Sequence, residues 1–203
     1  SLTPVSFWRR PHTLLAFWVV TCAAYLAVIV EESPGYHHVV FGPHSWPSIV
    51  SWFLLAATFV TSSTGSIAAG LPGTSSVRRW LLASWGLIII WALWLVLRHV
   101  FEPLVYPIDM RAPDRVDFRC ACETFLWGFA PLAVFYGILR SLATVQPART
   151  GSLCVLAAFS SSAFLIEIVC NDESVFHQLW GHWLLVVVLG WLGFRAGRAL
   201  LRW

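Results

Sequence analysis

Six long apolar stretches constrain this chain more than any other feature of its sequence. A helix needs about 20 mostly apolar residues to cross a hydrocarbon core about 30 Å thick. Of the 203 residues, 58% are hydrophobic and 11% are charged, whereas charged residues make up about 25% of a typical soluble domain. We therefore expect an all-α polytopic membrane protein. The predicted spans are His12 to Val30, Ser48 to Ala69, Trp80 to Val100, Cys120 to Leu139, Gly151 to Val169 and Gly181 to Leu201.

Helix-breaking residues separate these spans and leave little chain for a soluble domain. Pro removes a backbone donor and Gly favours turns, so clusters of the two end a helix. Residues 1–203 are therefore expected to form a single membrane domain, a six-helix up-down bundle. The only Met is Met110 and position 1 is Ser, so we expect further residues upstream of Ser1. The breakers lie at Ser33–Gly35, Gly70–Gly73, Pro103, Pro107, Pro113 and Pro147.

The basic residues predict the orientation, because basic residues are retained on the cytoplasmic side of a bilayer. In a six-span alternation, nine of the 13 basic residues, all of them Arg, fall on one side with no Asp or Glu. This side and both termini are therefore expected to be cytoplasmic. Arg195, Arg198 and Arg202 share one face of the last span, where they could dock an acidic partner or bind lipid phosphates. The nine are Arg9, Arg10, Arg78, Arg79, Arg140, Arg149, Arg195, Arg198 and Arg202.

Two pairs of small residues lie four positions apart, Gly65 with Ala69 and Gly193 with Gly197. This spacing lets two helices approach closely. We expect packing within the chain, with homodimerisation as the alternative.

Three of the five cysteines lie at the outer ends of two neighbouring spans. Cys120 and Cys122 begin the fourth span and Cys170 follows the fifth, and one turn deeper lie Glu123 and Glu167. If the two spans form an antiparallel hairpin, a layer of thiols covers a layer of carboxylates. Cys120 and Cys122 are about 200° apart around a helix, so only one of them can face Cys170. Cys120 is preferred because it shares a face with Glu123.

Three uses of these thiols are compatible with the sequence. They can pack as small apolar residues, Cys170 can form a disulfide in an oxidising compartment, or the cysteines can bind a metal ion transiently with carboxylates and outer histidines such as His177. A nucleic-acid partner is not expected, because the formal net charge is only +3, and no cofactor is expected beyond such a transient metal ion. An enzyme is not expected either, because the sequence contains no HExxH motif or phosphate-binding glycine loop. The outer histidines are His37, His38, His44, His99, His177 and His182.

Three runs in the C-terminal half carry a family resemblance. They are Cys120–Pro131 (CACETFLWGFAP), Cys170–Trp180 (CNDESVFHQLW) and Gly190–Trp203, which closes with Leu-Arg-Trp. Together they resemble the NrsF family, negative regulators of sigma factor F. The start of the chain, Leu2–Val5 with Arg9-Arg10-Pro11, looks like the end of the cytoplasmic N-terminal segment of that family.

The resemblance implies a six-span anti-sigma factor of the bacterial inner membrane. Such a protein sequesters an extracytoplasmic-function sigma factor and releases it when the outer face senses stress, here a metal or an oxidant. The two outer cysteines of the family match Cys170 and one of Cys120 or Cys122 by position. The segment that binds the sigma factor is then expected upstream of Ser1. The rival hypothesis is a structural or accessory subunit of a larger membrane complex, with membrane lipids and other subunits as its partners.

Overall fold

The structure is a computed structural model that describes residues 11–32, 46–70, 76–105, 118–140, 142, 144–170 and 174–201. Within these ranges all regular secondary structure is helical, which confirms the predicted class. The last three elements follow one another without a break. The elements are α1 (Pro11–Glu32), α3 (Trp46–Ala69), α4 (Val77–Val105), α5 (Phe118–Arg140), α6 (Pro147–Val169), α7 (Val175–His177), η3 (Gln178–Trp183) and α8 (Leu184–Leu200).

Five helical stretches are long and apolar enough to cross a membrane. The first predicted span lies within α1, whose described side chains include a shorter apolar stretch, Thr13–Tyr25. The helical segment that carries the last predicted span begins at Val175, before the predicted start of that span at Gly181. The reason is a local cap, since the Ser174 side chain accepts the backbone N–H of His177 at 3.3 Å. The five stretches are Trp46–Ala69, Val77–Phe101, Arg119–Arg140, Pro147–Val169 and Val175–Leu200.

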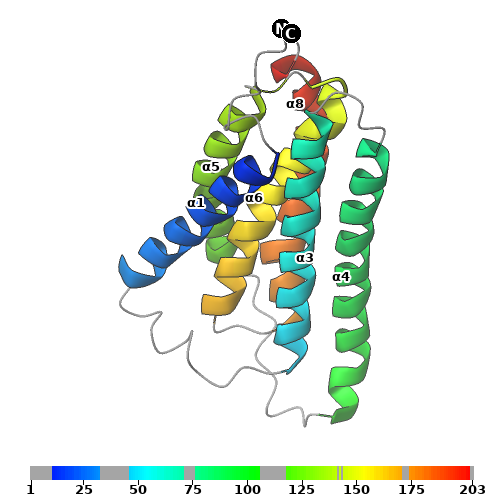
Figure 1. Cartoon of the computed structure of the whole chain (residues 1–203). Coiled ribbons are helices and arrows are strands. Elements are labelled where there is room, and N and C mark those ends of the chain that lie inside the picture. The colour runs from blue at the N-terminus through cyan, green and yellow to red at the C-terminus, as the bar shows by residue number, and fades with distance from the viewer. Residues whose placement is uncertain are drawn as a thin grey trace, which may run out of the picture.

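The central helix is α6, which packs against α3, α5 and α8 (Figure 1). Its sequence is rich in Gly, Ala and Ser, and small side chains let helix backbones approach closely. A Cβ atom on Gly151 would lie 2.5 Å from the Gly193 carbonyl oxygen and 2.6 Å from the Gly197 Cα. A Cβ atom on Gly65 would likewise lie 2.5 Å from the Trp80 Cβ. Both small-residue motifs are therefore used for packing within the chain, as predicted.

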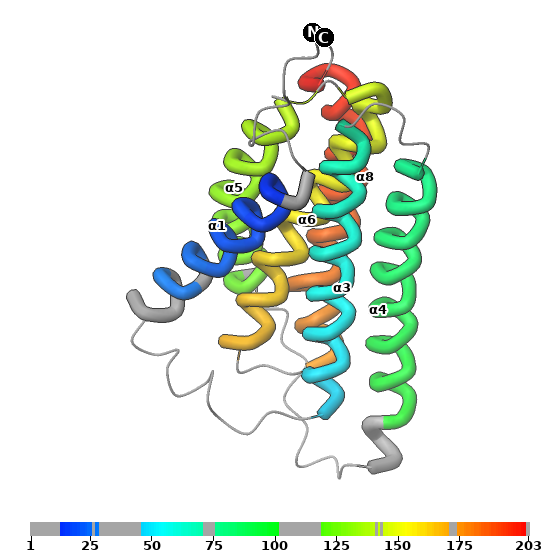
Figure 2. Tube along the Cα trace, in the orientation of Figure 1, coloured from blue at the N-terminus to red at the C-terminus, as the bar shows by residue number. Residues whose placement is uncertain are grey.

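A buried indole attaches α1 to the rest of the bundle. Figure 2 shows α1 crossing the other helices at an oblique angle. Trp18 stacks on Phe135 of α5 with ring centroids 4.4 Å apart, and its Nε1 donates to the Ser63 Oγ of α3 at 2.9 Å. An indole buries a large apolar surface and still needs a partner for its N–H, and this site supplies both.

The helix contacts define two ends of the bundle. At one end Gly70, just after α3, lies against Leu142, and Tyr136 of α5 donates to the Leu200 carbonyl oxygen of α8 at 2.9 Å. We call this the arginine end, because six of the nine arginines predicted to be cytoplasmic lie in the helix turns there. Arg9, Arg10 and Arg202 lie outside the described residues. The six are Arg78, Arg79, Arg140, Arg149, Arg195 and Arg198.

The opposite end, which we call the cysteine end, is formed by the start of α5, the end of α6 and the residues that lead into η3. The start of α3 and the last turns of α4 meet on the same side, where the Trp94 Nε1 of α4 donates to the Pro47 carbonyl oxygen at 3.2 Å. The pairs α3 with α4, α5 with α6 and α6 with α8 are therefore antiparallel. The fold therefore places Cys120 and Cys170 at the opposite end of the helices from these six arginines.

Candidate functional site

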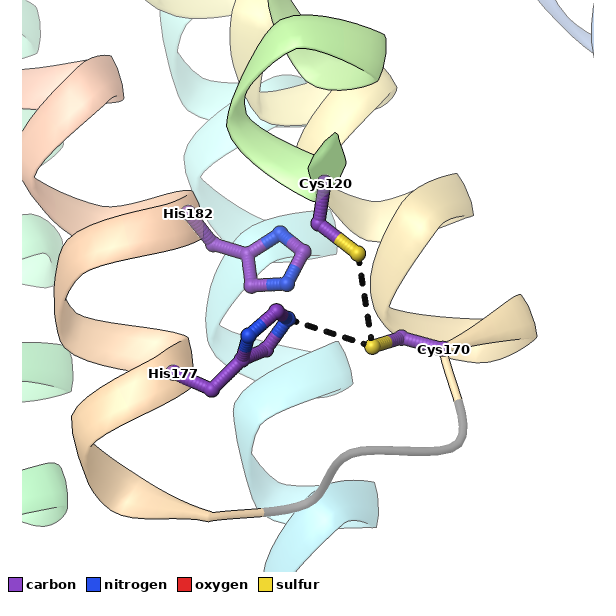
Figure 3. Close-up of side chains that lie close together, drawn as sticks. All are labelled: Cys120, Cys170, His177 and His182. Carbon is purple, nitrogen blue, oxygen red and sulfur yellow. Dashed lines mark hydrogen bonds between the residues drawn. The ribbon is translucent and has the colours of Figure 1, made fainter. Parts of the chain in front are cut away.

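The cysteine end brings together two of the three predicted thiols. Cys120 lies in the first turn of α5, and Cys170 is the extended C-cap residue of α6. Their Sγ atoms are 3.6 Å apart (Figure 3), a non-bonded distance compared with about 2.05 Å in a disulfide. Cys122 is exposed and lies outside this cluster. The structure confirms that Cys170 lies close to one of the two cysteines at the start of α5, and that this cysteine is Cys120.

Two histidines complete the cluster. The Nε2 of His177 lies 3.3 Å from the Cys170 Sγ, and the His177 and His182 ring centroids are 5.3 Å apart. One ligand atom from each of the four side chains lies within 4.8 Å of the other three. Both histidines are buried, with exposed fractions of 2% for His177 and 0% for His182. The close-up shows the two rings facing the two sulfur atoms (Figure 3).

The π-helix η3 explains how His177 and His182 reach the same place. In an α-helix, five residues correspond to a rotation of about 500°, which leaves the two side chains about 140° apart. In a π-helix the backbone bonds join residues five apart, and here the Leu184 N–H donates to the Leu179 carbonyl oxygen. Residues five apart therefore lie one above the other. From the sequence alone, His182 is named only as one of six outer histidines whereas His177 is singled out, because residues five apart do not share a face of an α-helix.

Three contacts attach α7 and η3 to α4. Arg98, which is 7% exposed, donates to the Gln178 Oε1 at 2.9 Å. The Trp183 Nε1 donates to the Ile88 carbonyl oxygen at 2.9 Å, and the Phe176 ring meets the His99 ring edge to face at 5.6 Å. Hydrogen bonds to a charged group in a water-poor environment are strong. The segment that carries the histidines is thus held from the side opposite the cysteines.

The cluster changes the acidity of Cys170, which lies just beyond the apolar stretch of α6 that is long enough to cross a membrane. The hydrogen bond with Cys120 lowers the pKa of the Cys170 thiol well below its ordinary value. Burial raises the pKa, and the hydrogen bonds with His177 and His182 lower it. Since the thiolate is both the nucleophile and the metal ligand, the site favours the reactive form of this sulfur.

The predicted layer of carboxylates is not what the structure shows at Glu123. Its Oε1 pairs with the Arg119 Nε at 2.9 Å, one turn earlier on the same helix. Opposite charges at i and i+4 attract, whereas two facing carboxylates repel each other. Glu167 is 5% exposed in α6. Within the described ranges, neither glutamate belongs to the four-residue cluster; a second imidazole takes the place predicted for carboxylate.

The arginine end offers a groove. It has a volume of about 560 Å³, and both Arg149 and Arg198 line it. The Arg198 guanidinium lies 5.4 Å from the centroid of the Phe194 ring, and that of Arg195 lies 5.7 Å from the Trp191 ring. Arg195 and Arg198 are exposed, as a docking surface requires, while Arg202 lies outside the described residues.

No curated protein and no solved structure matches this chain. A family comparison does, and it covers far more than the C-terminal runs on which the resemblance rested. The whole chain, residues 1–203, matches the family described as NrsF, negative regulator of sigma F. The chain belongs to the NrsF family of negative regulators of sigma F.

Proposed function

We propose that this protein is an integral membrane anti-sigma factor of the bacterial inner membrane, with six spans in an up-down bundle and both termini in the cytoplasm. It sequesters an extracytoplasmic-function sigma factor at the arginine end and releases it when the Cys120–Cys170 pair at the cysteine end meets a metal or an oxidant. The observation that carries the proposal is the family match over residues 1–203. The five apolar helices and the position of the Cys120–Cys170 pair at the end opposite the six arginines support the membrane-spanning part.

Release by an oxidant needs only a small movement of the two sulfur atoms. Two thiols give up two protons and two electrons and form one S–S bond, while a peroxide takes up both and becomes two molecules of water. The Sγ atoms start 3.6 Å apart and must approach to about 2.05 Å. The hydrogen bonds that favour the Cys170 thiolate also favour its attack on an oxidant.

The orientation is tested by labelling single cysteines in a background in which the native cysteines are replaced by Ala or Ser. Ser33→Cys and Ser174→Cys are expected to react with a membrane-impermeant maleimide from the periplasm. Thr74→Cys and Ala148→Cys are expected to react only after the inner membrane is opened, because the arginine end is retained in the cytoplasm. The reverse pattern would contradict both the orientation and the sensing role of the cysteine end.

Binding of the sigma factor is tested by pull-down from detergent extracts. A form extended ahead of Ser1 is expected to retain more sigma factor than the chain from Ser1 onward. Changing Arg195→Ala and Arg198→Ala together should reduce retention about 5- to 30-fold, if each charge contributes about 0.5–1 kcal/mol. The matched control is Arg195→Lys with Arg198→Lys, which keeps the charges. Retention of other membrane subunits and no sigma factor would favour the structural-subunit hypothesis instead.

A further inference from the structure

We infer that Cys120, Cys170, His177 and His182 form a four-ligand site for one divalent cation of the zinc type. The inference names the ligand of the sensing pair, and only its regulatory consequence rests on the proposed function. Four side chains from α5, the end of α6, α7 and η3 converge on one point (Figure 3). Two sulfur and two imidazole ligands make up one of the common tetrahedral zinc sites.

The distances fit such an ion. With Zn–S about 2.3 Å and Zn–N about 2.0–2.1 Å, the edges of the tetrahedron are about 3.8 Å for S to S and about 3.5 Å for S to N. The Sγ atoms of Cys120 and Cys170 are 3.6 Å apart, and the Cys170 Sγ is 3.3 Å from the His177 Nε2. These two edges match the tetrahedron, and the remaining ligand atoms lie within 4.8 Å of one another, so the four side chains need to close in by only about 1 Å around an ion.

The charges fit as well. Two thiolates and two neutral imidazoles carry a total charge of −2, which one divalent cation neutralises. Burying an uncompensated charge is expensive, whereas a neutral metal complex avoids most of that penalty. The buried histidines and half-buried cysteines thus suit a bound ion. Binding holds both sulfurs as thiolates and releases any proton that they still carry.

The π-helix gives this site a structural basis. Short π-helical turns are rare and occur frequently at functional sites. Here η3 places His182 beside His177, and the contacts of Gln178 and Trp183 with α4 hold that turn in place. A Cβ atom on Gly181 would lie 3.6 Å from the His177 Nε2 and 3.9 Å from the Cys120 Cβ. The backbone of η3 therefore closes one side of the site.

The bound ion and the disulfide exclude each other, because both use the same two sulfurs. Oxidation of the metal-bound pair by a peroxide transfers two electrons from the thiolates to the peroxide, which takes up two protons and becomes two waters. One S–S bond forms and the cation leaves. The metal-bound state is then the resting state of the sensor, and the signal is the disulfide that replaces the ion, or a more thiophilic ion that exchanges with it, rather than loss of the resting ion itself.

The test is titration of the reduced full chain in detergent with Co²⁺, whose tetrahedral complexes absorb strongly in the visible range. Wild type is expected to bind one Co²⁺ with thiolate charge-transfer absorption, and Zn²⁺ is expected to displace it. His182→Ala should weaken binding at least about 100-fold, since changes in the outer shell of a metal site alone typically weaken it about 10- to 100-fold. Cys122→Ser is the matched control and should bind as wild type does.

His182→Cys covers the case in which His182→Ala does not fold. It supplies a sulfur in place of a nitrogen and is expected to bind Co²⁺ with stronger charge-transfer absorption. No tetrahedral Co²⁺ signal in the reduced wild type, or an unchanged affinity in the folded His182→Ala variant, would overturn the inference. Retention of the sigma factor, measured in the same preparations, separates this failure from failure of the proposed function.

Discussion

Replacing Cys170 by Ser is expected to abolish release of the sigma factor in response to a peroxide or a thiophilic metal ion. Cys170 contacts both the Cys120 sulfur and the His177 ring, so its loss removes the disulfide and the metal site together. Repression without the signal should persist, because the arginine end is untouched. Transcription from a promoter that depends on the sigma factor measures both repression without the signal and induction by the signal. In Cys170→Ser the induction is expected to be lost completely.

Cys122→Ser is the matched control for this experiment. Cys122 lies two residues from Cys120 on the same helix, but it is exposed and outside the cluster. Its replacement should leave both repression and induction unchanged. Full induction in Cys170→Ser, or equal losses in Cys170→Ser and Cys122→Ser, would contradict the role assigned to the cluster.

The second large effect is expected at Gly151, where α6 and α8 meet. Gly151→Ala should destabilise the folded protein by about 1–3 kcal/mol, the usual penalty for adding atoms to a well-packed contact. The new Cβ atom would lie 2.5 Å from the Gly193 carbonyl oxygen and 2.6 Å from the Gly197 Cα. These are backbone atoms, so one of the two helices must move. Thermal unfolding in detergent measures the loss.

Gly137→Ala and Gly86→Ala should have the opposite effect. A Cβ atom at either position meets nothing within 4 Å, and Ala is favoured over Gly inside a helix by about 0.5–1 kcal/mol. A Gly151→Ala variant as stable as these controls would contradict the close packing of α6 against α8.

The helices could be predicted from the sequence because apolar length is a strong signal. The central position of α6 has a weaker sequence signal. The spacing of Gly193 and Gly197 predicts a close helix contact, but Gly151, which lies against both of them, has no small residue at the same spacing. The proximity of Cys120 and Cys170 followed from helical periodicity and the short connection of α5 to α6.

The site could be predicted only as far as α-helical geometry holds. His182 could be named only as one of six outer histidines, because its side chain reaches His177 through η3 and periodicity arguments assume 3.6 residues per turn. Glu123 was expected in a layer of carboxylates below the thiols, whereas its side chain pairs with Arg119, four residues before it on the same helix. The hydrogen bond of Arg98 with Gln178 joins residues 80 positions apart, and no local sequence pattern predicts such a pair.

The central claim is that the outer cluster controls a sigma factor held on the opposite side of the membrane. The most direct test measures how much sigma factor co-purifies with the full-length protein from intact cells before and after a peroxide is added outside. The account predicts substantial sigma factor before treatment, little afterwards, and no change in Cys170→Ser. No sigma factor in either state, or the same amount in both states of the wild type, would contradict it.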